Sequence, residues 1–216
     1  MDGAQRQLRP FGLTYFQYED GDHVGMLLAL ASLAPIFLVV AETAVVLSRR
    51  EAAGILLLAG QLLNEALNLA LKLWIREDRP HQHLGDGYGM PSSHAQFMGF
   101  FAVYMALYFE RQVAALAAHR RLVLAGAAVL AALVAASRVY LGYHTAAQVL
   151  AGVAAGVASG AAWYAFVERV VRGGGILDAA LATRPCRWLL IRDSRGIRDI
   201  ARAEYDLSMA ARRKQA

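Results

Sequence analysis

Five segments of the chain are strongly apolar and carry few charged residues. They cover about residues 24–48, 53–75, 94–109, 122–141 and 145–167. A helix needs about 20 residues to cross the roughly 30 Å hydrocarbon core of a bilayer, and only the third segment is clearly shorter than that. The pattern therefore predicts an all-α, integral membrane bundle of about five transmembrane helices.

Two features near the N-terminus refine this prediction. Pro35 lies inside the first apolar segment, where it removes a backbone donor and predicts a kink. Residues 1–23 carry charges without a central apolar run, unlike a cleavable signal peptide. We therefore expect the first helix to act as an uncleaved anchor.

The composition agrees with a membrane protein. The chain is 57% hydrophobic and 18% charged, whereas about a quarter of the residues of a typical soluble domain are charged. The single cysteine, Cys186, cannot form an internal disulfide, so cysteine usage does not indicate the compartment.

Positive charge is concentrated at the C-terminal end. Residues 169–216 contain eleven Lys and Arg against five Asp and Glu, so the net charge of +5 belongs to this end. We expect a membrane-embedded domain over residues 1–168 and an irregular, basic tail over 169–216. Such a tail could bind nucleic acid. An excess of Lys and Arg on the cytosolic side of a membrane protein is the simpler interpretation, so no nucleic-acid partner is expected.

The basic residues also predict the orientation in the membrane. With five spans the tail lies on the same side as the loops near Arg49 and Arg120, and this side holds sixteen of the 22 basic residues. The positive-inside rule then makes the tail cytosolic. It places loops 76–93 and 138–145 on the non-cytosolic side.

The candidate chemistry lies on this second side. It comprises one ammonium group, two guanidinium groups, two imidazoles and two hydroxyls: Lys72, Arg79, Arg138, His94, His144, Ser92 and Ser93. Arg binds phosphoryl oxygens bidentately and Lys binds them as a point charge, so the set fits a phosphoryl group. The two histidines then provide a nucleophile or base and an acid.

Each of these residues alone has a simpler explanation. A single Arg at a membrane boundary most often extends to the headgroups, and a single His near a helix end is usually a hydrogen-bonded polar residue. Ionisable residues in or beside membrane spans are energetically costly, however. Their convergence on one side of the membrane therefore favours a functional site.

The spacing of these residues resembles the type 2 phosphatidic acid phosphatase (PAP2) superfamily of membrane phosphatases. The first block of its pattern, Lys-x6-Arg-Pro, begins here at Lys72. The second, Pro-Ser-Gly-His, begins at Pro91 with Ser93 in place of Gly. The third, Ser-Arg-x5-His-x3-Asp, begins at Ser137 with Gln148 in place of Asp.

Ser93 and Gln148, which depart from the PAP2 pattern, are similar to the residues that the dolichyl diphosphatase subfamily carries at these two positions. The runs 88–98 and 137–148 resemble its sequences, as do the polar residues at 64–68 and the tail motif at 190–194. The resemblance extends from about residue 14 to about residue 205.

The resemblance implies a role for each candidate residue. His144 would attack phosphorus to form a phosphohistidine, and His94 would protonate the departing lipid phosphate. The residues implied to hold the phosphoryl oxygens are Lys72, Arg79, Arg138, Ser92 and Ser93. No metal ion and no other cofactor is implied.

Three further residues could support this site. Gln148 lies one helical turn after His144, so its amide oxygen could accept the ring N–H, with simple helix packing as the alternative. Glu65 and Asn68 share a helical stripe with Lys72. Glu65 could support Lys72 or only stabilise the bundle, and Asn68 could lie between them.

Glycines recur every fourth residue beyond Gln148, at Gly152, Gly156 and Gly160. Small residues at this spacing allow helices to approach closely, within one chain or between two copies. We favour a role inside the monomer.

The resemblance implies hydrolysis of the polyprenyl lipid dolichyl diphosphate to dolichyl phosphate and inorganic phosphate. It places this reaction at the lumenal face of the endoplasmic reticulum membrane, where it would recycle the lipid carrier for N-glycosylation. One alternative is a PAP2-type phosphatase for phosphatidate or another polyprenyl diphosphate. Another is a non-enzymatic scaffold or transporter that binds anionic head groups. The sequence does not indicate the oligomeric state.

Overall fold

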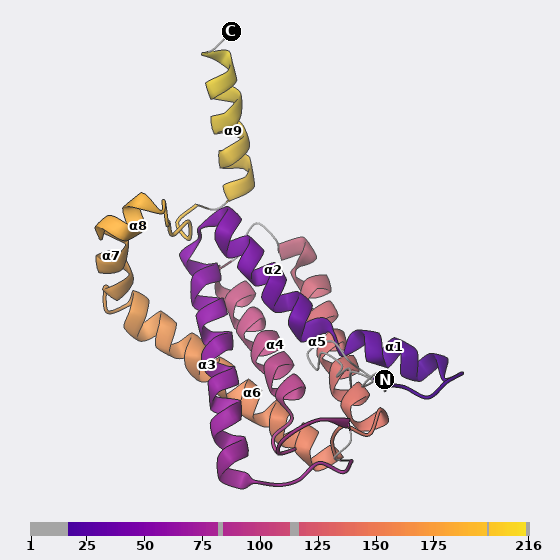
Figure 1. Ribbon diagram of the computed structural model, residues 1–216. Helices are drawn as coiled ribbons and strands as arrows, with labels where there is room; N and C mark the ends of the chain where they lie inside the picture. The colour runs from indigo at the N-terminus through magenta and orange to yellow at the C-terminus, as the bar shows by residue number, and fades with distance from the viewer. Residues whose placement is uncertain (1–16, 82–83, 113–116, 198, 215–216) are drawn as a thin grey trace, which may run out of the picture.

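The computed structural model describes residues 17–81, 84–112, 117–197 and 199–214. Within these ranges the regular structure is helical apart from one isolated bridge between Glu51 and Arg192. Figure 1 shows a membrane-type bundle with a C-terminal extension. Its elements are α1 (His23–Ala31), α2 (Ala34–Arg49), α3 (Ala52–Ile75), α4 (Ser93–Gln112), α5 (Ala117–Tyr140), α6 (Ala146–Phe166), the π-helix η2 (Val167–Arg172), α7 (Ile176–Leu181), α8 (Arg184–Trp188) and α9 (Ile200–Arg213).

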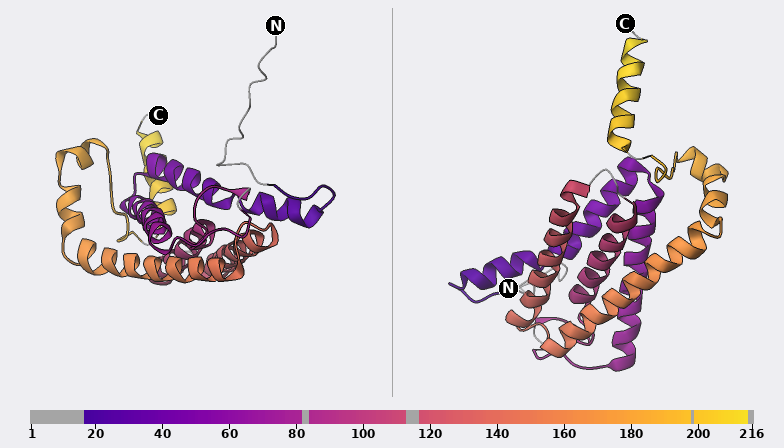
Figure 2. Two further views of the ribbon diagram at one scale, coloured as in Figure 1. Left: turned by 60° about the horizontal axis from the view of Figure 1, so that its bottom comes forward. Right: turned by 180° about the vertical axis from the view of Figure 1, so that it is seen from behind.

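Among the described residues, four helical stretches have the length and apolar composition of membrane spans: His23–Arg49, Ala52–Ile75, Arg120–Tyr140 and Ala146–Arg172. The fifth long helix, α4, has 20 residues and is about 30 Å long at 1.5 Å per residue. It packs against α6, α5 and α3, in the middle of the bundle (Figure 2). Its buried Gln96 is hydrogen-bonded to Asn64 and Asn68 of α3. The predicted all-α bundle of about five transmembrane helices is confirmed.

The first span is interrupted near the expected position. α1 ends at Ala31, and Pro35 is the second residue of α2. Because proline cannot donate the backbone hydrogen bond of a helix interior, it is tolerated only in the first turn of the new helix. Ser32, between the two helices, is buried and its Oγ lies 2.8 Å from Oγ of Ser137 on α5.

The regularly spaced glycines bring α6 directly onto the backbone of α4. A Cβ atom on Gly152 would lie 2.5 Å from the carbonyl oxygen of Ser92, and one on Gly156 would meet the carbonyl oxygen of Gln96. A Cβ atom on Gly160 would lie 2.9 Å from the carbonyl oxygen of Phe100. The glycines therefore serve the packing of the monomer, as expected.

Buried amides connect the three helices α3, α4 and α6. Nδ2 of Asn68 on α3 donates to Oε1 of Gln96 on α4 at 2.8 Å, and Nε2 of Gln96 donates to Oδ1 of Asn64 at 2.9 Å. The hydroxyl of Ser159 on α6 donates to the same Asn64 oxygen at 2.8 Å. Interhelical hydrogen bonds of this kind fix how the helices are rotated against each other.

The tail is more regular than the sequence indicated. α6 continues through η2 to Arg172, and three more helices follow, of which α9 has 14 residues. Asp199 caps α9 by accepting from the backbone N–H of Arg202 at 2.9 Å. The expectation of an irregular tail was therefore wrong, while the domain boundary at residue 168 stays a prediction. α9 extends away from the bundle at the end opposite the α3–α4 and α5–α6 loops (Figures 1 and 2).

Candidate active site

Four chain segments meet at the lower end of the bundle in Figure 1: the loop after α3, the start of α4, the end of α5 and the start of α6. The three sequence blocks lie on these segments, so the fold brings them together. The backbone N–H of Ser92 donates to the carbonyl oxygen of Gln148 at 3.0 Å, and that of His144 donates to the carbonyl oxygen of Arg138 at 3.0 Å. Backbone hydrogen bonds thus join the second block to the third and close the turn between α5 and α6.

Gln148 fixes the ring of His144. Its Oε1 lies 3.1 Å from Nδ1 of His144, and its Nε2 donates at 2.8 Å both to Oε1 of Glu77 and to the carbonyl oxygen of Asp78. Because the amide nitrogen faces these two acceptors, the amide oxygen must face the histidine. Nδ1 therefore carries the proton, and Nε2 keeps its lone pair.

Arg79 lies at the other ring nitrogen. Its Nη1 is 3.3 Å from Nε2 of His144, and its Nε donates to the carbonyl oxygen of Gly87 at 3.3 Å. His144 is 2% exposed. Burial, followed by the positive charges of Arg79 and Arg138, lowers the pKa of His144 to about 3, against the opposing hydrogen bond with Gln148. The imidazole is therefore neutral at neutral pH and able to act as a nucleophile.

The other two cations are Arg138 and Lys72, and each is held by contacts of its own. Arg138 is 2% exposed, donates from Nη1 to Oγ of Ser32 at 3.3 Å, and places its guanidinium carbon 4.1 Å from the ring centroid of Tyr143. Lys72 donates to the carbonyl oxygen of Tyr88 at 2.9 Å. Arg79, Arg138 and Lys72 all interact electrostatically with His144, so together they create a positive field suited to a phosphoryl group.

The start of α4 supplies the second histidine and a hydroxyl. His94 interacts electrostatically with His144 and with all three cations, so it belongs to the same cluster. In the described part of the chain, the buried Oγ of Ser92 has no hydrogen-bond partner. An unsatisfied buried hydroxyl is costly in a finished core and is expected where a ligand completes its hydrogen bonds.

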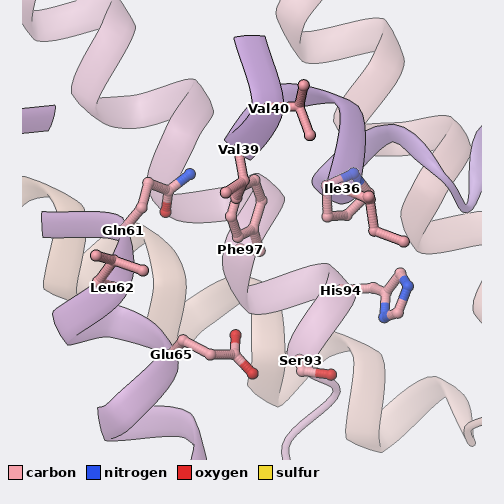
Figure 3. Close-up of a pocket in the computed structure, with 10 residues that line it drawn as sticks. Ile36, Val39, Val40, Gln61, Leu62, Glu65, Ser93, His94 and Phe97 are labelled. Atoms are coloured by element: carbon pink, nitrogen blue, oxygen red, sulfur yellow. The ribbon is translucent and has the colours of Figure 1, made fainter. Parts of the chain in front are cut away.

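An apolar groove of about 440 Å³ adjoins this cluster between α2, α3 and α4. Ile36, Val39 and Phe97 form its apolar part, while Glu65, Ser93 and His94 extend into it at one end (Figure 3). Its lining includes the exposed side chains of Val40 and Leu62 on the outer surface of the bundle. The groove therefore joins the histidine cluster to the surface that faces lipid.

The supporting residues of α3 divide between two environments. Glu65 attracts Lys72 electrostatically without forming a hydrogen bond or ion pair with it in the described structure. Asn68 does not lie between them, because its side chain turns to Gln96 and to the carbonyl oxygen of Pro91, 3.3 Å away. Glu65 thus lines the groove, whereas Asn68 belongs to the buried amides of the bundle.

Several residues that support the site were not predicted from the sequence. Glu77 accepts a hydrogen bond from the side-chain amide of Gln148, and Ser32 accepts one from Arg138. Gln96 accepts one from the side-chain amide of Asn68. For Gln96 a signal existed, because an amide within a membrane helix requires a partner. Glu77 and Ser32 had no such signal, since their roles depend on contacts between segments distant in the sequence.

No group of three His, Cys, Asp or Glu side chains with the arrangement of metal ligands occurs among the described residues. The charges available to a phosphoryl group are those of the two arginines and the lysine.

The sequence profile described as the PAP2 superfamily matches residues 53–172, which include all three blocks. The chain belongs to the PAP2 superfamily. A solved structure with the same fold is "the first transmembrane PAP2 type phosphatidylglycerolphosphate phosphatase from Bacillus subtilis". Its TM-score is 0.60 at 24% sequence identity, and the match covers 74% of this chain and 83% of that one.

Curated relatives of this PAP2 member match over almost the whole chain. Dolichyldiphosphatase 1 of Homo sapiens is 38% identical, over 96% of this chain and 91% of the relative. Lipid phosphate phosphatase gamma of Arabidopsis thaliana is 36% identical, over 99% of this chain and 96% of the relative. The putative dolichyldiphosphatase of Neurospora crassa is 35% identical, over 92% and 91%.

Proposed function

We propose that this protein hydrolyses dolichyl diphosphate to dolichyl phosphate and inorganic phosphate. The observation that carries the proposal is the buried, neutral His144, whose Nε2 faces the cationic cluster while its Nδ1 proton is held by Gln148. The substrate follows from the near full-length similarity to proteins named dolichyldiphosphatase.

In the first step Nε2 of His144 attacks the terminal phosphorus. The N–P bond forms as the bond from phosphorus to the bridging oxygen breaks. His94, protonated once the negatively charged diphosphate is bound and offsets the three cations, gives its proton to that oxygen. In the second step His94 takes a proton from water while the water oxygen attacks the phosphohistidine. Inorganic phosphate leaves, and His144 returns to its neutral state.

The remaining residues stabilise the charge that develops on the phosphoryl oxygens. Arg79 and Arg138 bind as guanidinium forks, and Lys72 binds as a point charge. The hydroxyl of Ser92 gains in the substrate the partner that it lacks in the described structure. Ser93 lies at the polar end of the groove, where its hydroxyl is the last of the proposed groups that bind the phosphoryl oxygens (Figure 3).

The groove supports a lipid substrate. Its apolar part accepts the first isoprenoid units, while the diphosphate reaches His94 and His144. A diphosphate arriving from the bilayer then need not leave the membrane to react.

Phosphate release from dolichyl diphosphate by the purified protein in detergent and EDTA tests the proposal. His144→Ala serves as the inactive control. Release that is absent in EDTA and restored by Mg²⁺ would contradict the mechanism.

A second candidate substrate is another lipid phosphate, because a relative named lipid phosphate phosphatase gamma is almost as similar as the dolichyldiphosphatases. A panel of phosphatidate, polyprenyl diphosphates and dolichyl diphosphate separates the two. A kcat/KM at least tenfold higher for phosphatidate than for dolichyl diphosphate would favour this second candidate.

We also propose that the protein resides in the endoplasmic reticulum membrane with its histidine cluster in the lumen and residues 169–216 in the cytosol. The distribution of basic residues supports this orientation. Glycosylation acceptors inserted at 49–51 or 111–121 should stay unmodified, and an acceptor inserted at 84–86 should be glycosylated. The reverse pattern would overturn the orientation.

A further inference from the structure

A second cationic pocket lies at the end of the bundle opposite the histidine cluster. Its volume is about 540 Å³, and it lies between the end of α2 and the segment that follows α8. We call it the arginine pocket; its lining residues are Ser48, Arg49, Arg50, Arg187, Leu190, Ile191 and Arg192.

The chain returning from α8 fixes the walls of the arginine pocket. The backbone N–H of Arg192 donates to the carbonyl oxygen of Arg50 at 3.0 Å, and its own carbonyl oxygen accepts from the N–H of Ala52 at 2.9 Å. The carboxylate of Glu51 accepts from Nε of Arg192 at 2.7 Å and from the N–H of Ser194 at 3.2 Å. The pocket is therefore a built feature that joins the α2–α3 turn to the tail.

Two of its four arginines are neutralised and two are not. Arg49 and Arg192 both bind Glu204 on α9, at 2.9 Å and 2.6 Å. Arg50 and Arg187 make no ion pair and no side-chain hydrogen bond within the described part of the chain. Two guanidinium groups thus remain available to an anion.

The surroundings of the pocket are those of a membrane interface. Trp188 is 82% exposed and Leu190 is 65% exposed. Tryptophan concentrates at the level of the lipid head groups, where its ring contacts both the acyl chains and water. An anion bound here would therefore lie between apolar side chains and the aqueous phase.

We propose that the arginine pocket binds the phosphate of an anionic phospholipid in the leaflet opposite the active site. Arg50 and Arg187 hold the phosphate oxygens, and the acyl chains run beside Leu190 and Trp188. Basic pockets at the ends of transmembrane helices bind lipid head groups in this way.

Native mass spectrometry of the full-length protein in detergent tests this site, with phosphatidylserine, phosphatidylcholine and inorganic phosphate as probes. Arg50→Gln combined with Arg187→Gln should weaken phosphatidylserine binding at least about tenfold, since it removes two charge-assisted contacts. The matched control, Arg121→Gln with Arg213→Gln, removes the same charge from exposed positions and should change the affinity less than twofold.

Phosphate release by the Arg50/Arg187 variant should equal that of the wild type, so the result is independent of the proposed activity. An equal loss of phosphatidylserine affinity in the control variant would show that the lipid is attracted by the general surface charge. That result would overturn the proposal of a specific binding pocket. Unchanged affinity in the test variant, or equal binding of phosphatidylcholine, would also overturn it. Displacement of phosphatidylserine by millimolar inorganic phosphate would identify a site for free anions and would refute the proposal that the pocket binds a phospholipid.

Discussion

Oε1 of Gln148 lies 3.1 Å from Nδ1 of His144, so a neutral amide occupies the position where the PAP2 pattern resembled by this chain has a carboxylate. An amide oxygen fixes the tautomer of the histidine as a carboxylate does. It does not stabilise the imidazolium by charge, however, and the surrounding arginines also oppose protonation. His144 therefore stays neutral at neutral pH, as its proposed role as nucleophile requires.

This arrangement predicts that removing the amide impairs chemistry more than binding. Gln148→Leu leaves His144 free to turn or to change tautomer, so kcat should fall about 10²-fold with KM changed less than threefold. In Glu77→Gln an amide oxygen still accepts from Gln148, so kcat should stay within about threefold of the wild type. Equal kcat values for both variants in steady-state assays would refute the orienting role.

The two histidines should respond differently to the leaving group. His144→Ala removes the nucleophile and should abolish hydrolysis of every substrate. His94→Ala should lose about 10²–10⁴-fold on a monoester, less on a diphosphate, and least on a substrate whose leaving group has a low pKa. The measurement is kcat/KM across these three substrates. Rescue of His144→Ala by the good leaving group, with His94→Ala inactive, would show that the roles are reversed.

The lowered pKa of His144 predicts a pH dependence of stability. Between pH 3 and about 6.5 the unfolded chain binds a proton at His144 that the folded chain does not, so folding is favoured as pH rises. This contribution is complete above about pH 6.5 and is lost as pH falls, at most about 1.4 kcal/mol per pH unit. Melting temperatures of the wild type and His144→Asn should converge from pH 7 to pH 4. Parallel curves would refute the pKa shift.

The packing of α6 on α4 predicts a contrast between two glycines. A Cβ atom on Gly156 would collide with the carbonyl oxygen of Gln96, whereas one on Gly126 of α5 meets nothing within 4 Å. Gly156→Ala should destabilise the bundle by about 1–3 kcal/mol and lower the melting temperature in detergent. Gly126→Ala should leave it unchanged or raise it, because alanine favours the helix. Equal melting temperatures for the two variants would contradict the close packing.

The sequence alone predicted the helical bundle, the interruption near Pro35 and the convergence of the three blocks. The length of the apolar segments and the spacing of the motif residues determine these features. It did not predict that Glu77 holds Gln148 or that Gln96 joins Asn64 to Asn68, because helices that are apolar on every side do not reveal how they are rotated. α9 was missed although Asp199 is a recognisable N-cap.

The groove between α2, α3 and α4 has a consequence for how a turnover ends. It opens on the lipid-facing surface at Val40 and Leu62, while the residues of the histidine cluster belong to the segments that meet at the α3–α4 and α5–α6 end of the bundle. The two products therefore depart in different directions: the lipid phosphate diffuses sideways into the bilayer, and the inorganic phosphate escapes into water. The proposed two-step mechanism sets their order: His94 can activate water only after the bridging oxygen has left it, so dolichyl phosphate departs first and inorganic phosphate follows. Because the two exits differ, accumulated dolichyl phosphate in the membrane competes with new substrate without blocking the escape of inorganic phosphate.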